Sequence, residues 1–274
     1  MPAPESNARD EPGEITGALA TAPVPRAALV TGGARRIGRA LVRALADAGF
    51  AVAIHHHRSD AEADALVAEI ARAGGSAIAL AADLADEAAV TKLLPQAAAA
   101  LGPIGVLVNN AAIFHNDTLA NATRETWDAH LAINLRAPFV LIQEFAALLP
   151  PEAGGAIVNL LDERIWNLTP YFVSYTVSKT ALWTLTRTMA LALAPRIRVN
   201  GIGPGPALPS RRQTPEHFLA RCRSLPLRRG TSPDEIAAAL RFILAAPAMT
   251  GQMIALDGGE HLGWRQAGHA ALVE

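Results

Sequence analysis

The sequence predicts a single α/β domain, built on a doubly wound parallel sheet of about seven strands with helices on both faces. Three observations lead to this prediction. Short apolar runs alternate with longer helix-like runs from Arg26 onward. The strand-like runs are continuously apolar, which is typical of strands buried on both faces. A helix-like run follows nearly every strand-like run, as the crossover connections of a parallel sheet require.

The expected elements follow one another regularly along the chain. Strands are expected at AALVT (27–31), AVAIH (51–55), SAIAL (76–80), IGVLVNN (104–110), AIVNLL (156–161), RIRVNGI (196–202) and QMIAL (252–256), and helices at 36–48, 60–72, 87–101, 124–149, 173–194 and 234–245. These units fill nearly all of residues 26–260, so no separate substrate domain is expected. The Ala-rich helices alone would suggest a helical bundle, but the β-branched runs between Gly and Asn residues argue against it.

The ends and the composition of the chain indicate where it works and what it binds. Residues 1–25 are rich in Pro, Ala and acidic groups, which predicts a disordered or loosely attached tail before a domain at 26–274. A net charge of −1 favours small-molecule partners over nucleic acid or an acidic membrane. No apolar run is expected to reach the ~18 residues needed to span a bilayer. The single cysteine, Cys222, agrees with the reducing cytoplasm, and no metal site is expected.

A glycine-rich turn follows the first expected strand. In TGGARRIG, Gly32, Gly33 and Gly38 bracket the start of the next helix, and Arg35 and Arg36 add cationic groups. Glycines let backbone N–H groups approach a pyrophosphate, and the helix N-terminus supplies partial positive charge. The order of strand, glycine turn and helix therefore predicts a dinucleotide cofactor.

The residues after the second expected strand indicate which dinucleotide binds. A site for NADH usually has an acidic residue there, which accepts a hydrogen bond from the ribose 2′-hydroxyl, but this chain has HHHRS. Arg58 with Ser59, and His57 beside them, can bind a 2′-phosphate, so NADPH is expected. The alternative is that Arg58 is a solvated residue before a helix that Ser59 or Asp60 caps.

A tyrosine and a lysine lie four residues apart in YTVSK, within the expected helix at 173–194. Residues at i and i+4 share one helix face, so the groups of Tyr175 and Lys179 point into the same space. A nearby cation lowers the pKa of a phenol, and Tyr175 is expected to exchange a proton near neutral pH. For the YxxxK pattern alone, an ordinary amphipathic helix is the alternative.

Together these motifs resemble the short-chain dehydrogenase/reductase family over about residues 26–260, which implies a Rossmann-like fold. The resemblance rests on TGGARRIG, on Asp83 in AADL, on NNAA (109–112), on Asn134 in INLRAP, on YTVSK, on IRVNGIGPG (197–205) and on LDGG (256–259). The implied cofactor-binding residues are Gly32, Arg35, Arg36, Ile37, Gly38, His57, Arg58, Ser59, Asp83, Leu84, Asn110, Ala111, Asn134, Tyr175, Lys179, Pro204 and Gly205. The family also implies a homodimer or homotetramer paired through the helices at 124–149 and 173–194.

Two departures from the common family pattern resemble its pteridine reductase branch. Arg36 stands where most members have glycine, and Asp162 stands where most have a serine, thirteen residues before Tyr175 (175 − 162 = 13). This resemblance implies that Arg36 reaches the pterin and the cofactor phosphates and that Phe114 stacks on the pterin. The implied catalytic residues are Asp162, Tyr175 and Lys179, with Lys179 on the nicotinamide ribose, and the implied substrate-binding residues are Arg36, Phe114, Asp162, Tyr175 and Leu208.

The chemistry of a pterin explains these residues. A flat heterocycle with an aminopyrimidine edge needs a stacking surface and groups that exchange hydrogen bonds with ring nitrogens. A simple ketone needs a neutral hydroxyl donor, which an ionised aspartate would oppose. The sequence therefore predicts NADPH-dependent reduction of a pteridine, of the dihydropterin, dihydromonapterin, dihydrofolate or biopterin type. The alternatives are a reductase of another carbonyl or planar substrate and a non-catalytic NADPH-binding sensor.

Two further expectations concern the rest of the site. Residues 206–230 are expected to form a flap over the substrate, in which the arginines either bind an anionic tail, such as the glutamate of folate, or are solvated. Asp117, Asp128 and Glu144 are isolated acids, for which hydrated positions are expected.

Overall fold

Seven parallel strands form one sheet in the computed structural model, which describes residues 22–210 and 213–263. The strands are β1 Ala27–Val30, β2 Ala51–His56, β3 Ala77–Ala81, β4 Val106–Asn109, β5 Gly155–Leu160, β6 Ile197–Pro204 and β7 Met253–Leu256. Their order across the sheet is β3-β2-β1-β4-β5-β6-β7, and every neighbouring pair is parallel. The predicted doubly wound α/β fold is confirmed.

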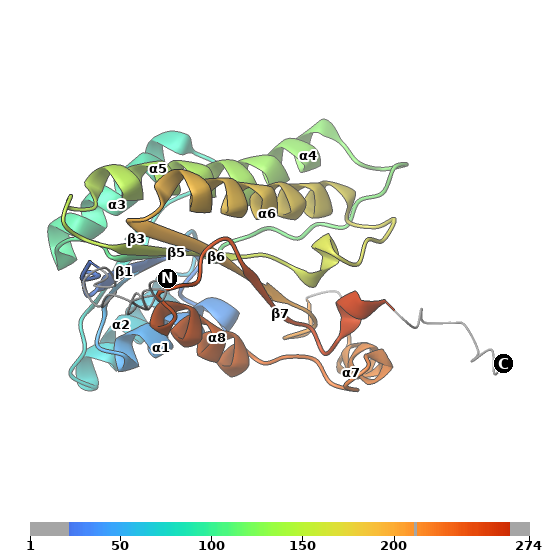
Figure 1. The fold of residues 1–274 in the computed structure, drawn as a ribbon. Coiled ribbons are helices and arrows are strands. Elements are labelled where there is room, and N and C mark those ends of the chain that lie inside the picture. The colour runs from blue at the N-terminus through green and yellow to red at the C-terminus, as the bar shows by residue number, and fades with distance from the viewer. Residues whose placement is uncertain (1–21, 211–212, 264–274) are drawn as a thin grey trace, which may run out of the picture.

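Helices cover both faces of this sheet (Figure 1). They are α1 Arg36–Asp47, α2 Asp60–Arg72, α3 Glu87–Leu101, α4 Arg124–Leu131, α5 Ala137–Leu148, α6 Val173–Leu193, α7 Pro215–Ser224 and α8 Pro233–Ala245. Helices α1, α2 and α8 lie on one face, and α3, α5 and α6 lie on the other, while α7 stands outside both layers (Figure 1).

The core consists of two apolar layers, one on each face of the sheet. Successive side chains of a strand point to opposite faces. Accordingly, Ala28 and Val30 of β1 pack in the layer under α1 and α8, whereas Leu29 packs with Phe145 in the layer under α3 and α5. Both faces of β1 are fully buried, which explains why the strand-like runs are apolar without alternation.

The helix expected at 124–149 is interrupted. Residues Ala132–Arg136 form a π-helical segment between α4 and α5. Pro138 lacks an N–H group and cannot continue the α-helical hydrogen bonding, while Ala137 N–H bonds back to Ala132 O, five residues earlier. Asn134 lies in the middle of this π segment, where its side chain hydrogen-bonds Ile113 and Ser178.

The same helical span corrects one expectation about membranes. By length and composition, Arg124–Leu148 could cross a bilayer. The inner face of α5, including Leu141, Ile142 and Phe145, packs in the core layer shared with α3. Burial in the fold thus explains much of the apolar character of this span.

The two ends of the expected domain also differ in detail from the prediction. The expected tail was residues 1–25, of which 1–21 lie outside the described residues. Pro23 O accepts a hydrogen bond from Gly154 N (3.1 Å), and Val24 packs against the core, so the attached chain begins before Arg26. The expected flap contains α7, which Thr214 caps by accepting from His217 N, and Arg211 and Arg212 lie outside the described residues.

Candidate active site

Two cavities meet at the carboxyl ends of the strands. The inner cavity, of about 490 Å³, is lined by Asp162, Tyr175 and Lys179 among others. The glycine-turn cavity, of about 850 Å³, is lined by Gly32, Arg58 and further residues. Both cavities share the lining residues Arg36, Ile37, Asn110, Ala112, Phe114 and Ser210. A ligand that fills one therefore reaches the wall of the other.

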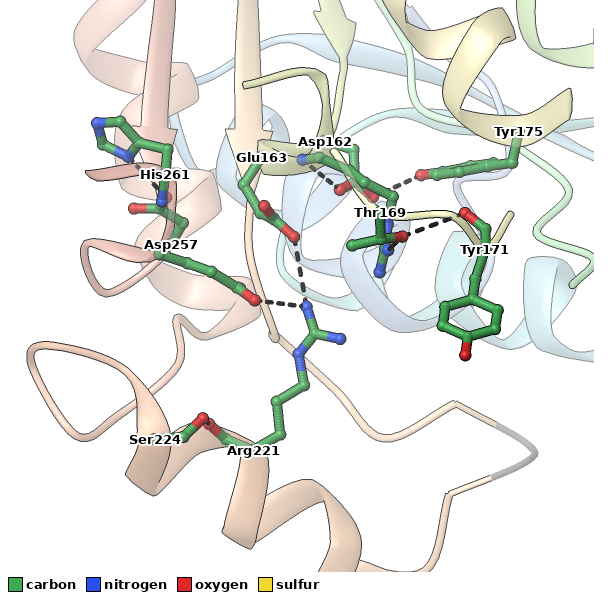
Figure 2. A network of polar contacts seen from close by, with 11 residues as sticks. Asp162, Glu163, Thr169, Tyr171, Tyr175, Arg221, Ser224, Asp257 and His261 are labelled. Atoms are coloured by element: carbon green, nitrogen blue, oxygen red, sulfur yellow. Dashed lines mark hydrogen bonds and ion pairs between the residues drawn. The ribbon is translucent and has the colours of Figure 1, made fainter. Parts of the chain in front are cut away.

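A hydrogen bond joins Tyr175 and Asp162, which both line the inner cavity (Figure 2). The phenol donates to Asp162 Oδ2 at 2.6 Å, and Tyr175 is only 5% exposed. The other carboxylate oxygen of Asp162 accepts from Arg164 N at 3.0 Å, which caps the short 3-10 turn Glu163–Ile165. Both oxygens of the carboxylate are thus held in place.

The environment of Tyr175 corrects the expected pKa. Burial raises the pKa of Tyr175 well above its ordinary value, and the charge and hydrogen bond of Asp162 raise it further. The expectation that Lys179 lowers this pKa is wrong, because the ammonium lies 5.9 Å from the centre of the ring, while the carboxylate touches the hydroxyl. Tyr175 therefore keeps its proton at neutral pH and can serve as a proton donor.

Lys179, one helical turn after Tyr175, is also buried. Its Nζ donates to Leu160 O, at the end of β5, with a distance of 2.6 Å. Burial lowers the pKa of Lys179 to about 8, against the opposing effect of Asp162. The lysine joins α6 to the end of β5, and its ammonium also lines the inner cavity.

Three aromatic rings form one wall of the inner cavity. Phe114 and Phe172 stack with their centroids 4.3 Å apart and their planes 4° apart, and the Tyr175 ring meets Phe114 edge-on at 4.6 Å. The guanidinium of Arg164 lies 4.9 Å from the Phe172 ring centre. Sequence reasoning found Phe114 but missed Phe172, whose signal is its place at the helix start three residues before Tyr175.

The glycine turn is held by a residue that sequence reasoning also missed. Gly32 has φ +62°, and its N–H donates to His55 Nδ1 at 3.1 Å. His55 Nε2 lies 3.1 Å from Ala82 O and supplies the donor there. Burial lowers the pKa of His55 to about 4, so the ring is neutral and can accept the bond. A Cβ at Gly38 would lie 2.1 Å from Gly32 O, so this position admits only glycine.

Arg36 connects the two cavities to the flap. Its backbone is left-handed (φ 53°), a conformation that costs an ordinary residue about 1 kcal/mol. Its Nη2 donates to Pro209 O at 3.1 Å, and the residue lines both cavities.

Most of the expected site residues line these cavities. Those on the glycine-turn cavity are Gly32, Arg35, Arg36, Ile37, Gly38, His57, Arg58, Ser59, Asp83, Leu84, Asn110, Ala111 and Phe114, and those on the inner cavity are Arg36, Ile37, Asn110, Phe114, Asp162, Tyr175, Lys179, Pro204, Gly205 and Leu208. Asn134 lines neither cavity. It is fully buried and holds Ile113 through two hydrogen bonds, at 2.9 and 3.0 Å, so it supports the wall from behind.

Polar contacts of Arg221 tie α7 to Glu163, and both residues line the inner cavity (Figure 2). Arg221 Nη2 lies 2.9 Å from Glu260 Oε1 and 3.3 Å from Glu163 Oε1. Glu163 is 2% exposed, and burial raises its pKa to about 8, with the charge of Asp162 acting in the same direction. At neutral pH, Glu163 is therefore largely protonated, and the charge of Arg221 is balanced mainly by Glu260.

Comparisons with known proteins identify the family of this chain. Residues 32–261 match the family model described as enoyl-(acyl carrier protein) reductase. A 3-oxoacyl-[acyl-carrier-protein] reductase of Synechocystis is 34% identical over 245 residues, which cover 87% of this chain and 98% of that protein.

Two solved structures are similar over most of their length. FolM alternative dihydrofolate reductase 1 from Brucella canis, complexed with NADP, is 47% identical with a TM-score of 0.87, covering 92% of this chain and 100% of that one. A blue fluorescent protein from a metagenomic library, in complex with NADPH, is 36% identical with a TM-score of 0.80, covering 85% and 97% respectively.

The raised pKa of Glu163 predicts a pH dependence of stability. The ordinary value is 4.5 and the folded value about 8, so the folded state binds the proton more tightly between these limits. The free energy of unfolding should therefore fall as pH rises through this window. Glu163→Gln should remove that part of the fall, as measured by urea unfolding at several pH values.

Glu87→Gln is the matched control for this experiment. Glu87 is exposed, and its hydrogen bond with Arg136 lowers its pKa, so its titration lies below the window. This variant should keep the slope of the wild type. An unchanged slope in Glu163→Gln would contradict the prediction.

Proposed function

Because the chain belongs to the short-chain dehydrogenase/reductase family, we propose that it is an NADPH-dependent reductase of a pteridine. The proposed substrates are of the dihydropterin, dihydromonapterin, dihydrofolate or biopterin type. One observation carries this proposal: the phenol of Tyr175 donates a hydrogen bond of 2.6 Å to the carboxylate of Asp162, in the cavity that Phe114 also lines. The 47% identity to the Brucella FolM dihydrofolate reductase supports it.

NADPH fits the residues of the glycine-turn cavity. Gly32 and Gly38 let the turn pack closely against the start of α1, since a Cβ at Gly38 would lie 2.1 Å from Gly32 O. The N-terminus of α1 would favour the negative charge of a pyrophosphate. Arg58 would hold the 2′-phosphate through its guanidinium, with His57 beside it, and Lys179 would hold the nicotinamide ribose. When bound, NADPH supplies the hydride for reduction.

The residues of the inner cavity would orient the ring and supply the proton. Phe114 offers a flat surface on which a heteroaromatic ring can stack. Asp162 can accept hydrogen bonds from an aminopyrimidine edge, while Arg164 N keeps its carboxylate oriented. Tyr175 holds a proton on its phenol oxygen at neutral pH and would donate it to a ring nitrogen as negative charge develops there.

Reduction of another carbonyl substrate is the second candidate function. The names of several relatives, including the 3-oxoacyl-[acyl-carrier-protein] reductase of Synechocystis, favour it. A carbonyl oxygen that gains negative charge needs donors around it. The carboxylate of Asp162 beside the phenol of Tyr175 supplies acceptors instead, and this arrangement favours a substrate with N–H donors.

We also propose that the protein forms a homodimer or homotetramer in the cytoplasm. Exposed apolar side chains lie along α5 and α6, namely Leu148, Val177 and Leu191. A second copy that covered them would remove this apolar surface from water. The buried, unpaired Cys222 agrees with a reducing compartment.

A substrate panel tests the proposed reaction. NADPH oxidation should depend on added dihydrobiopterin or dihydrofolate and should be slow with an acetoacetyl thioester or a simple ketone. Asp162→Ser, which introduces the hydroxyl found in most family members, should lower kcat/KM for the pteridine by about 100-fold or more. Turnover of the thioester but of no pteridine would sink the substrate assignment.

The role of Tyr175 predicts a separation of turnover from cofactor binding. Tyr175→Phe removes only the hydroxyl, and loss of a positioned proton donor typically lowers kcat by about 100- to 10,000-fold. NADPH affinity, measured by fluorescence titration, should change little. Undiminished turnover would remove Tyr175 from the proposed mechanism.

The position of Arg58 predicts a change of cofactor preference. Arg58→Ala removes a guanidinium that can pair with the 2′-phosphate, so NADPH affinity should fall by about 10- to 100-fold. NADH affinity should stay nearly constant, because that cofactor has no 2′-phosphate. Equal losses for both cofactors would instead mean that Arg58 is a solvated surface residue.

A further inference from the structure

The helix that carries Tyr175 and Lys179 starts without a cap of its own. The residue before α6 is Phe172, which is left-handed (φ 59°) and has no polar group in its side chain. The first N–H groups of any α-helix lack partners within the helix. At the start of α6, Ser174 is buried, and Phe172 and Val173 are partly buried, so these N–H groups need acceptors within the protein.

Asp117 takes up the N–H groups at this helix start. Its backbone oxygen accepts from Phe172 N at 2.7 Å and from Val173 N at 3.4 Å. Its carboxylate accepts from Ser174 N at 3.2 Å and also from the Ser174 hydroxyl. Three consecutive N–H groups thus end on a single residue, and the negative charge lies at the positive end of the helix dipole.

Asp117 is buried, contrary to the hydrated position expected for it, because it is 2% exposed. It belongs to the loop between β4 and α4, more than fifty residues before α6 in sequence. Sequence reasoning treated it as an isolated acid, since its partners are distant in the chain. A buried carboxylate needs hydrogen-bond donors, and Ser174 at the start of α6 provides them to Asp117.

A buried histidine extends this arrangement to α4. His115 N donates to His130 Nε2 at 3.2 Å, so the proton of the ring is on Nδ1. That nitrogen lies 2.9 Å from Thr126 O and 2.7 Å from Ser174 Oγ. Burial lowers the pKa of His130, which keeps the ring neutral. The hydrogen bonds therefore run from His130 to Ser174 and from Ser174 to Asp117.

These contacts fix the residues that form the wall of the inner cavity. Phe114 lies three residues before Asp117 on the same loop, and Phe172 and Tyr175 lie on either side of Ser174. The stacking of the two phenylalanines and the edge contact with Tyr175 hold only while the loop and the helix start keep their separation. A displacement of about 1 Å at a reacting group can lower turnover about 100-fold.

We infer that Asp117 is a positioning residue, which sets the first turn of α6 and thereby the hydrogen bond of Tyr175 to Asp162 and the spacing of the aromatic wall. The inference deepens the proposed function, on which its kinetic readout rests. It concerns a residue that touches neither cavity, since Asp117 is absent from the lining of both.

The test compares Asp117→Ala with Ser232→Ala. Ser232 caps α8 by accepting from Glu235 N at 3.2 Å, so its loss removes a helix cap away from the inner cavity. Asp117→Ala should lower kcat for the pteridine about 10- to 100-fold with NADPH affinity unchanged, whereas Ser232→Ala should leave kcat unchanged. Equal kcat values in the two variants would overturn the inference.

A second measurement needs no substrate and so separates this inference from the proposed function. The chain has two tyrosines, and in a Tyr171→Phe background only Tyr175 titrates. Ultraviolet absorbance of the phenolate should show no ionisation of Tyr175 near its ordinary pKa, which burial raises first and Asp162 second. Asp117→Ala should lower the pKa of Tyr175 measurably, because the phenol then loses the charge and hydrogen bond of Asp162, while burial keeps part of the shift. An unchanged titration in the folded variant would overturn the inference even if pteridines prove to be substrates.

Asp117→Asn keeps the experiment decisive if the alanine variant does not fold. The amide oxygen can still accept from Ser174 N, but the charge and the acceptor for the Ser174 hydroxyl are lost. If Asp117→Ala folds, the kcat and the phenolate titration of Asp117→Asn should lie between those of the wild type and those of Asp117→Ala. If Asp117→Ala does not fold, both quantities in Asp117→Asn should differ measurably from the wild type. Values equal to the wild type in both measurements would contradict the positioning role.

Discussion

The hydrogen bond between the buried Tyr175 and the partly buried Asp162 is the interaction on which the site depends, because it joins the end of β5 to the first turn of α6. Lys179 repeats this connection one turn later through Leu160 O. The strand end and the helix are thus tied at two points, and the carboxylate is fixed further by Arg164 N. Burial of Tyr175 and the adjacent carboxylate of Asp162 both raise the pKa of the phenol, so Tyr175 retains its proton.

The topology of the sheet explains why residues so distant in sequence meet at this bond. The strand order reverses between β1 and β4, and ligands of open α/β sheets bind at such a point. Thr31 closes this seam, because its hydroxyl accepts from Asn110 N and Ala111 N, both at 3.0 Å. The glycine turn after β1 and the loop after β4 therefore lie side by side and share a wall between the two cavities.

Sequence reasoning located the strands and most helices because their signals are local. A continuous apolar run predicts a buried strand wherever it occurs, and strand ends converge at one edge whatever the side chains are. The residues it missed or misjudged depend on distant contacts. The pKa of Tyr175 follows from burial and from Asp162, His55 acts through the N–H of Gly32, and Asp117 finds its partners on α6. No local pattern carries that information.

Arg36, with its left-handed backbone, can couple the binding of ligands in the two cavities. Arg36 lines both cavities, and its guanidinium donates a hydrogen bond to Pro209 O in the flap. A ligand in either cavity therefore changes the surroundings of this guanidinium. Thermodynamic linkage requires any resulting coupling of affinities to be equal in both directions. A substitution of Arg36 that changes the affinity for the substrate ring would thus also change the affinity for the dinucleotide. The two specificities are therefore linked at this residue.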